Sequence, residues 1–523
     1  MGEVSRRTLI AAGGALLAPC GVWAAGPSPV AKTTNGPVRG YVDQGIKVFK
    51  GVRYGADTAP RRFRPPLAPR AWTKVLDATA YGPSSPQGSR DDQPQSEDCL
   101  LLNVWTPGLR DGARRPVMVY LHGGAYSNGS GSSPLYDGVR LCRRGEVVVV
   151  TINHRLNVFG YGFLAKLAGP EFADSGNVGM LDILLALRWV ADNAAEFGGD
   201  ASRVMVFGQS GGGAKIATMM AMPAAAGLFH TAATMSGQQV TASGPLHATE
   251  RMTLFLAAVG LTPERAGEAA TLPVARLLEG LAVRDPFTPG GLYFGPVLDE
   301  RSLTRHPFWP DAAPQGLKIP MIIGNTHDEA RAFVAHSKPD PFALGWDDVA
   351  GRIAPEMRVD IDPDHVVAAY RKLYPDYSPS EVFFAAITAG RSWRGAVIEA
   401  EERARGGAPA FVYQLDLPST VEAGRLRAMH ATDIPLVFDN LAARGSPTAP
   451  SAAAQAVADA MSEAFIAMAK TGNPNHPALP AWTPYDLTRR ATMVFDADTR
   501  LVDDPRGAER RLFAKVPYIQ PGT

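Results

Sequence analysis

The hydrophobic residues of this chain fall either into short continuous runs or into longer stretches with helical spacing. The continuous runs are typical of strands buried on both faces of a mostly parallel sheet. They occupy residues 117–121, 147–152, 204–207, 232–235, 320–324, 411–415 and 493–495. Residues 179–195 and 452–470 carry apolar side chains at helical spacing, and Gly472 and Pro474 stop the second stretch. This alternation predicts an α/β fold with a large, mostly parallel central sheet flanked by helices.

Three other regions depart from that alternation. Residues 32–54 alternate polar and apolar side chains around turn pairs at 35–36 and 44–45, which predicts antiparallel strands at one edge of the sheet. The regions around 245–292 and 334–407 are helical and irregular. We interpret them as insertions over the C-terminal edge of the sheet, where ligands bind in such folds. Residues 26–523 are therefore treated as one domain with two insertions.

The composition is that of an ordinary globular protein. The chain has 523 residues, a formal net charge of +1 and 46% hydrophobic residues. A nearly neutral balance gives no indication of a nucleic-acid partner or of an anionic membrane surface. Oligomeric state does not follow from the sequence.

The first 25 residues have the pattern of a cleaved export signal. Paired arginines at residues 6–7 precede an apolar run at 9–17, and small residues follow at Ala24 and Ala25. This arrangement is typical of a twin-arginine signal, and the run is too short to span a bilayer. We expect cleavage near Ala24 or Ala25, a periplasmic or secreted product and no stable membrane anchor. A disordered N-terminus with two incidental arginines is the alternative.

Cysteines are too few for a disulfide framework. Cys20 lies in the predicted signal, so Cys99 and Cys142 remain in the mature chain. We predict that each is a small buried apolar residue. A bridge between the two is the alternative.

The sequence Gly-Gln-Ser-Gly-Gly at 208–212 links the apolar run 204–207 to a helical stretch at 214–221. A serine on such a sharp strand-to-helix turn is the nucleophile elbow of an α/β-hydrolase. Gly-x-Ser-x-Gly alone is a weak signal, and a plain Gly-Ser turn is the alternative. The flanking strand and helix favour Ser210 as a nucleophile.

A serine nucleophile needs a base, and the base needs an acid to orient it. In α/β-hydrolases the chain order is nucleophile, acid, histidine. His430 lies in a loop after the run 411–415, where this fold places its base. His476 lies in a rigid turn typical of a structural residue, and His230 comes too early in the chain.

The acid is expected at the end of the predicted strand 320–324. Asp328 and Glu329 both lie there, and a solvated pair capping the next helix is the structural alternative. Residue patterning does not separate these two neighbours.

A glycine-rich turn after the run 117–121 supplies a candidate oxyanion hole. His122, Gly123 and Gly124 match the His-Gly-Gly loop of esterases. Glycines allow the backbone to present N–H groups to a developing negative charge. We expect His122 to support the loop and not to act as the base.

From Gly36 to Tyr485 the chain resembles the type-B carboxylesterases, which include cholinesterases and bacterial para-nitrobenzyl esterases. The serine signature spans residues 197–212, and a second signature spans 97–105, with Leu101 where tyrosine or threonine is commoner. The resemblance implies an α/β-hydrolase fold.

Site roles are also implied by the resemblance. Ser210 corresponds to the nucleophile and His430 to the base, and Glu329 is favoured over Asp328 as the acid. The resemblance further assigns the oxyanion N–H groups to Gly123, Gly124 and Gly211. It makes Glu97, Asp98 and Arg155 members of a structural ion-pair framework.

Several positions depart from the family pattern. Ser85 stands where some relatives have a cysteine, so Cys99 lacks that partner. Gln209 replaces the glutamate that usually precedes the serine, Gly211 replaces a common alanine, and Ala330 replaces a glycine after the acid. None of these changes removes a catalytic group.

We therefore predict a serine hydrolase that cleaves small uncharged carboxylic esters through an acyl-enzyme. Neither a metal nor an organic cofactor is implied, because His-Glu-x-x-His, paired Cys-x-x-Cys and a Rossmann fingerprint are missing. The alternatives are a non-catalytic binding or adhesion module and, among enzymes, a lipase, amidase or acyltransferase. The natural ester does not follow from the sequence. Candidate substrate-pocket residues, each also compatible with plain core packing, are Phe294, Trp309, Phe333 and Trp393.

Overall fold

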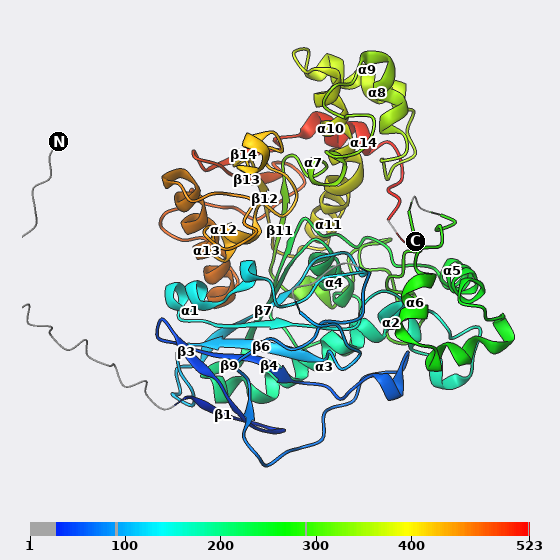
Figure 1. The fold of residues 1–523 in the computed structure, drawn as a ribbon. Coiled ribbons are helices and arrows are strands. Elements are labelled where there is room, and N and C mark those ends of the chain that lie inside the picture. Colours follow the sequence, from blue (N-terminus) through cyan, green and yellow to red (C-terminus); the bar gives the residue numbers. More distant parts are fainter. Residues whose placement is uncertain (1–27, 89–92, 288–289, 521, 523) are drawn as a thin grey trace, which may run out of the picture.

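The structure, a computed structural model, describes residues 28–88, 93–287, 290–520 and 522. The predicted export signal at residues 1–25 lies outside these described residues. Figure 1 shows the chain coloured from its N-terminus to its C-terminus.

The described chain is built on an 11-stranded sheet with the order β14-β13-β12-β11-β10-β9-β7-β8-β6-β4-β3. The strands from β8 to β13 in this order are parallel, while β6, β4 and β3 at one edge and β14 at the other are antiparallel. The predicted α/β fold with a mostly parallel sheet is confirmed. The strands are β3 (Tyr41–Asp43), β4 (Ile46–Arg53), β6 (Leu101–Thr106), β7 (Arg115–Leu121), β8 (Val148–Ile152), β9 (Gly199–Gln209), β10 (Thr231–Met235), β11 (Met321–Thr326), β12 (Ala410–Leu415), β13 (Ala491–Phe495) and β14 (Arg500–Asp503).

Each apolar run predicted as a strand overlaps one of these strands, but β6 and β14 were not predicted from periodicity. The edge prediction for residues 32–54 is right only for β3 and β4. The preceding strands β1 (Val30–Thr33) and β2 (Gly36–Arg39) form a separate small sheet with β5 (Leu76–Asp77). Alternation identifies a half-buried strand, but it does not identify the strand with which it pairs.

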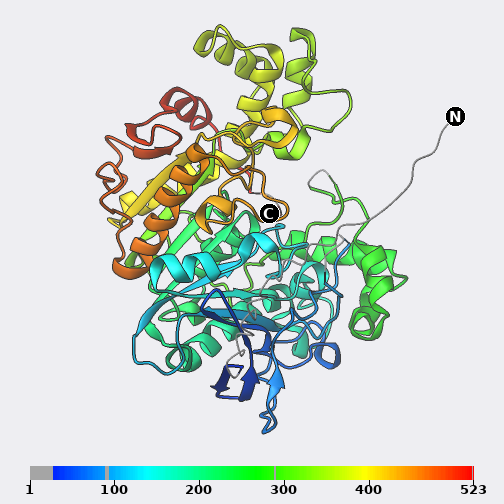
Figure 2. The same ribbon diagram turned by 60° about the vertical axis from the view of Figure 1, so that its left-hand side comes forward.

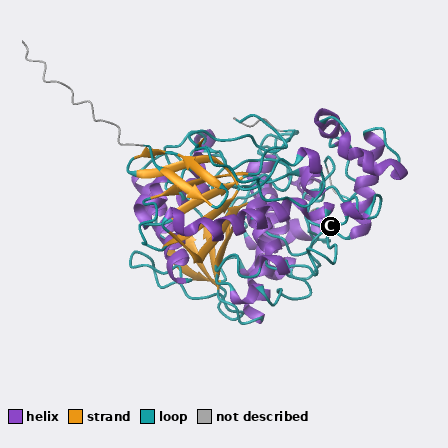
Figure 3. Ribbon diagram, turned by 90° about the horizontal axis from the view of Figure 1, so that it is seen from below, coloured by secondary structure: helices purple, strands orange, loops and turns teal. Residues whose placement is uncertain are grey.

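Helices cover both faces of the sheet because adjacent strand residues point to opposite sides. Val119 and Val206 belong to the core beneath α3 (Val178–Asn193) and α4 (Gly211–Met219). Their neighbours Met118 and Met205 belong to the opposite core, beneath α1 (Val139–Gly145) and α13 (Ala452–Thr471). Figure 3 shows the strands as a twisted layer surrounded by helices.

Two groups of helices extend beyond these layers, as Figures 1 and 2 show from two sides. The first comprises α5 (Pro245–Ala258) and α6 (Val274–Gly280). The second comprises α8 (Trp346–Ile353), α9 (Pro363–Leu373) and α10 (Pro379–Thr388), which enclose a small apolar core of their own. The helix that follows, α11 (Arg394–Arg405), instead packs on β11 and β12.

Other expectations concern single side chains. Cys99 and Cys142 are both buried and free. The residues of the expected ion-pair framework are paired: Glu97 with Arg62, Asp98 with Arg53, and Arg155 with Asp182. Within the described part of the chain, none of the helices combines the length and the apolar character needed to cross a membrane.

Candidate functional site

Ser210 lies on a tight turn between β9 and α4. Its backbone has φ 55° and ψ −125°, a strained conformation for a residue with a side chain. The turn fits here because the next residues are glycines: a Cβ on Gly212 would lie 1.9 Å from the carbonyl oxygen of Leu121 in β7. This is the geometry of a nucleophile elbow, which holds a serine hydroxyl above the C-terminal end of the sheet.

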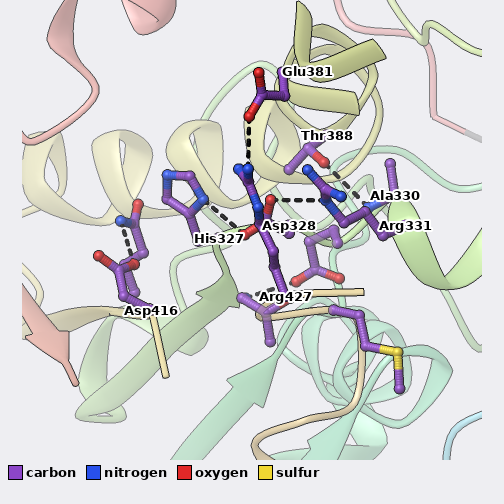
Figure 4. Close-up of polar contacts among 12 residues, drawn as sticks. His327, Asp328, Ala330, Arg331, Glu381, Thr388, Asp416 and Arg427 are labelled. Atoms are coloured by element: carbon purple, nitrogen blue, oxygen red, sulfur yellow. Dashed lines mark hydrogen bonds and ion pairs between the residues drawn. The ribbon is translucent and has the colours of Figure 1, made fainter. Parts of the chain in front are cut away.

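Glu329 and Asp328 follow β11 but point into different surroundings. Asp328 accepts hydrogen bonds from His327 at 3.0 Å and from Arg331 at 3.1 Å, and Figure 4 shows it in this polar cluster. Glu329 is fully buried, and its Oε2 is hydrogen bonded to Nδ1 of His430. The tertiary structure therefore separates two neighbours that residue patterning left open, and it pairs Glu329 with the histidine.

The charge of Glu329 is stabilised locally. Burial by itself raises the pKa of this carboxyl, but the charge and hydrogen bond of His430 outweigh burial and hold it below its usual value. The side chain of Ser236 and the backbone N–H of Thr326, which donates to Oε1 at 2.8 Å, act in the same direction. Glu329 is thus a buried carboxylate suited to holding an imidazole ring in one orientation.

The second ring nitrogen of His430 contacts the residue before the serine. Nε2 of His430 lies 3.0 Å from the side-chain amide nitrogen of Gln209. Since the carboxylate of Glu329 accepts from Nδ1, the proton of the neutral ring is on Nδ1 and Nε2 is the acceptor. The lone pair that a general base uses therefore faces the nucleophile turn.

Gly123 also lies against the turn that holds Gln209 and Ser210. A Cβ on Gly123 would lie 3.2 Å from Oε1 of Gln209 and 3.3 Å from Cβ of Ser210. The structure thus brings the loop 122–126, the serine turn and His430 together at the C-terminal ends of the parallel strands.

In the loop 122–126, the carbonyl oxygens of Gly123 and Gly124 are hydrogen bonded, whereas the N–H groups of these two residues are not, within the part of the chain that the structure describes. The oxygen of Gly123 accepts from Nδ1 of His122 at 2.9 Å, and that of Gly124 accepts from the backbone N–H groups of Ser127 and Asn128. Among the residues that the structure describes, the N–H groups of Gly123 and Gly124 have no acceptor. The N–H of Gly211 is in the first turn of α4, where no intrahelical partner exists. Unpaired backbone N–H groups of this kind are suited to binding an anion.

His122 is a supporting residue, as expected. Its ring stacks on His154 with centroids 4.7 Å apart. Burial and the nearby charge of Lys215 lower the pKa of His122 to about 3. It therefore stays neutral and donates to the loop.

The four candidate pocket aromatics lie in different places. Phe333, in α7 (Arg331–Val334), is 44% exposed, and its ring is 4.7 Å from the ring of His430. Phe294 is buried against Phe255, and Trp309 is exposed beside His306. Trp393 packs under the guanidinium of Arg506 and lines a small cavity. Only Phe333 has a direct contact with a proposed catalytic residue.

Sequence reasoning gave no site role to two side chains that the structure places here, Gln209 and Lys215. Gln209 was noted only as a departure from the usual glutamate. Lys215 is fully buried in α4, and its Nζ donates to the carbonyl oxygen of Ala125 at 2.6 Å. A lysine inside an otherwise apolar and glycine-rich helix was the available signal. Among the described residues, no group of three or more histidine, cysteine or acidic side chains has the arrangement of a metal site.

Known proteins resemble this chain over nearly its whole length. A family model described as the carboxylesterase family matches residues 27–513. The para-nitrobenzyl esterase of Bacillus subtilis is 33% identical over 92% of this chain and 98% of its own. The phenmedipham hydrolase of Pseudarthrobacter oxydans is 34% identical over 89% of this chain and 94% of its own. The crystal structure of a Geobacillus stearothermophilus carboxylesterase superposes with a TM-score of 0.83 at 36% identity, covering 92% of this chain and 99% of that one.

Proposed function

Because this chain belongs to the carboxylesterase family, we propose that its hydrolysis of carboxylic esters uses Ser210, His430 and Glu329 as a catalytic triad and passes through an acyl-enzyme. The observation that carries the proposal is the hydrogen bond from His430 to the buried carboxylate of Glu329, with the other ring nitrogen facing the turn that holds Ser210.

The reaction begins when Nε2 of His430 takes the hydroxyl proton of Ser210. The amide of Gln209 must give up Nε2 for this step, because one lone pair cannot accept both protons. The oxygen of Ser210 then attacks the ester carbonyl while Glu329 stabilises the imidazolium. His430 protonates the departing alcohol, and water repeats the sequence on the acyl group, which restores Ser210.

The negative charge on the carbonyl oxygen is received by the N–H groups of Gly123, Gly124 and Gly211. Two observations support this role: the carbonyl oxygens of Gly123, Gly124 and Ala125 are bonded elsewhere, and the N–H groups of Gly123 and Gly124 are left without acceptors among the described residues. Each such donor is typically worth about 3 kcal/mol of transition-state stabilisation.

The proposal is tested by replacing the nucleophile. Ser210→Ala should abolish turnover of para-nitrophenyl esters above the residual rate that oxyanion and substrate binding sustain. Full turnover by this variant would refute the triad. The unfolding temperature of the variant should match that of the wild-type protein, since the side chain of Ser210 has no hydrogen bond to any of the residues that the structure describes.

A non-catalytic binding module is the rival from another functional class, and a phosphonate probe separates the two. An organophosphonate should label the wild-type protein covalently at Ser210 and leave Ser210→Ala unlabelled, since only an activated serine attacks phosphorus. Absence of labelling in the wild-type protein would favour the binding module.

Lipase, amidase and acyltransferase activities share this machinery, and substrate profiles distinguish them. We propose small uncharged esters as the substrate class, with Phe333 bordering the bound ester beside His430. Hydrolysis rates measured against acyl-chain length and alcohol bulk, with matched amides, test this. A maximum at long, aggregated acyl chains or with amides would contradict the assignment.

We also propose that the protein is exported through its twin-arginine segment at residues 6–7, with cleavage near Ala24 or Ala25. Mass spectrometry of the mature N-terminus tests the cleavage. Replacing both arginines by lysine should leave the uncleaved chain in the cytoplasm. A wild-type protein that stays in the cytoplasm with its first residues attached would overturn the proposal.

A further inference from the structure

Lys215 lies in the first turns of α4, five residues after Ser210, and its entire side chain is buried. Its Nζ donates to the carbonyl oxygen of Ala125 at 2.6 Å and to that of Gly211 at 3.2 Å. The ammonium group also lies 5.0 Å from the ring centroid of Tyr126. No carboxylate forms an ion pair with it among the described residues. A buried cation bonded only to backbone oxygens and an aromatic face is costly, so its position calls for a function.

The two oxygens that Lys215 contacts belong to the two segments of the proposed oxyanion hole. Ala125 ends the loop that contains Gly123 and Gly124, while Gly211 follows the nucleophile. The two segments also touch directly, because a Cβ on Gly211 would lie 2.0 Å from the oxygen of Ala125. A single side chain thus joins both parts of the anion site.

An anion site requires that carbonyl oxygens point away from the bound charge. The oxygens of Gly123 and Gly124 are held by neutral donors, namely His122 and the N–H groups of Ser127 and Asn128. The oxygen of Ala125, which has φ 52°, is held by the ammonium of Lys215. In the described part of the chain, no other hydrogen bond to this carbonyl oxygen is present.

We propose that Lys215 is a positioning residue for ester hydrolysis, which fixes the loop 122–126 against the nucleophile turn and adds a buried positive charge behind the amides that receive the oxyanion. This inference rests on the proposed function. It extends that function to a residue whose side chain does not touch the substrate. The charge acts through a low-dielectric interior, where electrostatic effects are larger than in water.

The pKa values in this cluster indicate that Lys215 can change its charge while its neighbours do not. Burial lowers the pKa of Lys215 to about 7. The titratable groups that face it are Tyr126, His122 and His154. Burial raises the pKa of Tyr126 and lowers the pKa of both histidines, so none of the three changes charge near neutral pH. Lys215 is therefore the group of this cluster whose charge changes around pH 7.

The test compares Lys215→Met, which removes the charge and both hydrogen bonds, with Lys215→Gln, which keeps an uncharged donor. Lys372→Met, on the exposed end of α9, is the matched control for loss of one surface charge. For para-nitrophenyl acetate, we expect the kcat of Lys215→Met to fall on the order of tenfold. This loss is smaller than the 10²–10³-fold loss that removal of a direct oxyanion donor causes, and KM should stay within about twofold of wild type. Lys215→Gln should be intermediate and Lys372→Met unchanged.

A trifluoromethyl ketone reports on the oxyanion directly. The oxygen of Ser210 adds to its carbonyl carbon, His430 takes the hydroxyl proton, and the carbonyl oxygen becomes an anion held by the amides. Lys215→Met should bind this ketone more weakly by about the same factor as kcat falls. It should bind the matching alcohol, which forms no oxyanion, as the wild-type protein does. A merely structural loss would weaken both ligands alike.

The outcomes separate this inference from the proposed function. If Ser210→Ala keeps its turnover, the triad fails and the role of Lys215 fails with it. If Ser210→Ala is inactive but a folded Lys215→Met retains wild-type kcat and ketone affinity, only the role of Lys215 is refuted. If both Lys215 variants fail to fold, the wild-type protein decides: its ketone affinity should decline between about pH 6 and pH 8 as the buried amine loses its charge, and a constant affinity would overturn the proposal.

Discussion

The side-chain amide of Gln209 donates to Nε2 of His430 across 3.0 Å, so the residue before the nucleophile occupies the nitrogen that must accept the proton of Ser210. Relatives in this family usually have a glutamate at this position. A donor on the lone pair stabilises the neutral ring, whereas a carboxylate would stabilise the imidazolium.

Gln209→Glu should move the acidic limb of the kcat/KM profile to higher pH, by about one unit, because an opposite charge at this distance favours the protonated ring. Activity near neutral pH should fall accordingly. Gln209→Met separates loss of the hydrogen bond from gain of charge, and it should shift the limb less. Initial rates between pH 5 and 9 measure the effect. A shift to lower pH would contradict the contact.

Glu329→Gln should lower kcat by about 10³–10⁴, because an amide cannot stabilise the imidazolium and favours the wrong tautomer. Asp328→Asn is the matched control, since Asp328 bonds to His327 and Arg331 instead. Its kcat should stay within a few-fold of wild type, although stability falls. Steady-state kinetics with a para-nitrophenyl ester measures both. Equal losses of kcat in the two variants would contradict the assignment of separate roles to Glu329 and Asp328.

Gly211→Ala keeps its backbone N–H and should lower kcat by less than the roughly 10²–10³-fold of one lost oxyanion donor, through displacement of the loop 122–126. An added Cβ would lie 2.0 Å from the oxygen of Ala125 and 2.5 Å from its Cα, so the loop must move. Gly351→Ala in α8, where a Cβ meets nothing within 4 Å, is the control. Unchanged kcat in Gly211→Ala would mean that the loop adjusts without losing the anion site.

Glu399→Gln should stabilise the protein increasingly as pH rises. Glu399, in α11, is fully buried, and its Oε2 has no hydrogen-bond partner within the described ranges of the chain. Burial, opposed by the N–H of Gln239 and by Arg403, raises the pKa of Glu399 from 4.5 to about 8. The folded state therefore keeps a proton that the unfolded state loses, and wild-type stability falls between those two pH values.

The difference in free energy of unfolding between Glu399→Gln and wild type should grow by at most about 1.4 kcal/mol per pH unit across this window. It should be constant above the window. Denaturant unfolding at pH 5, 7 and 9 measures it. A difference that does not depend on pH would show that Glu399 is ionised in the folded protein at low pH.

Local sequence predicted the parts of this protein whose signals are periodic or contiguous. Fully apolar runs identified the parallel strands, because strands buried on both faces leave no polar alternation. The glycines around Ser210 predicted the elbow, because only glycine fits where β9, β7 and α4 approach so closely. The loop of His430 followed from chain order.

The tertiary structure decided what depends on where a side chain points. Asp328 and Glu329 are adjacent, and only the position of His430 determines which of them faces it. The apolar, glycine-rich helix around Lys215 was a sequence signal, but only the fold shows that the ammonium group is bonded to the backbone oxygens of Ala125 and Gly211. The hydrophobic pattern likewise could not predict that β1 and β2 pair outside the main sheet. The sequence by itself determined the elements and the chemical groups, because their signals are local. Direction, burial and charge environment were set by contacts between residues distant along the chain.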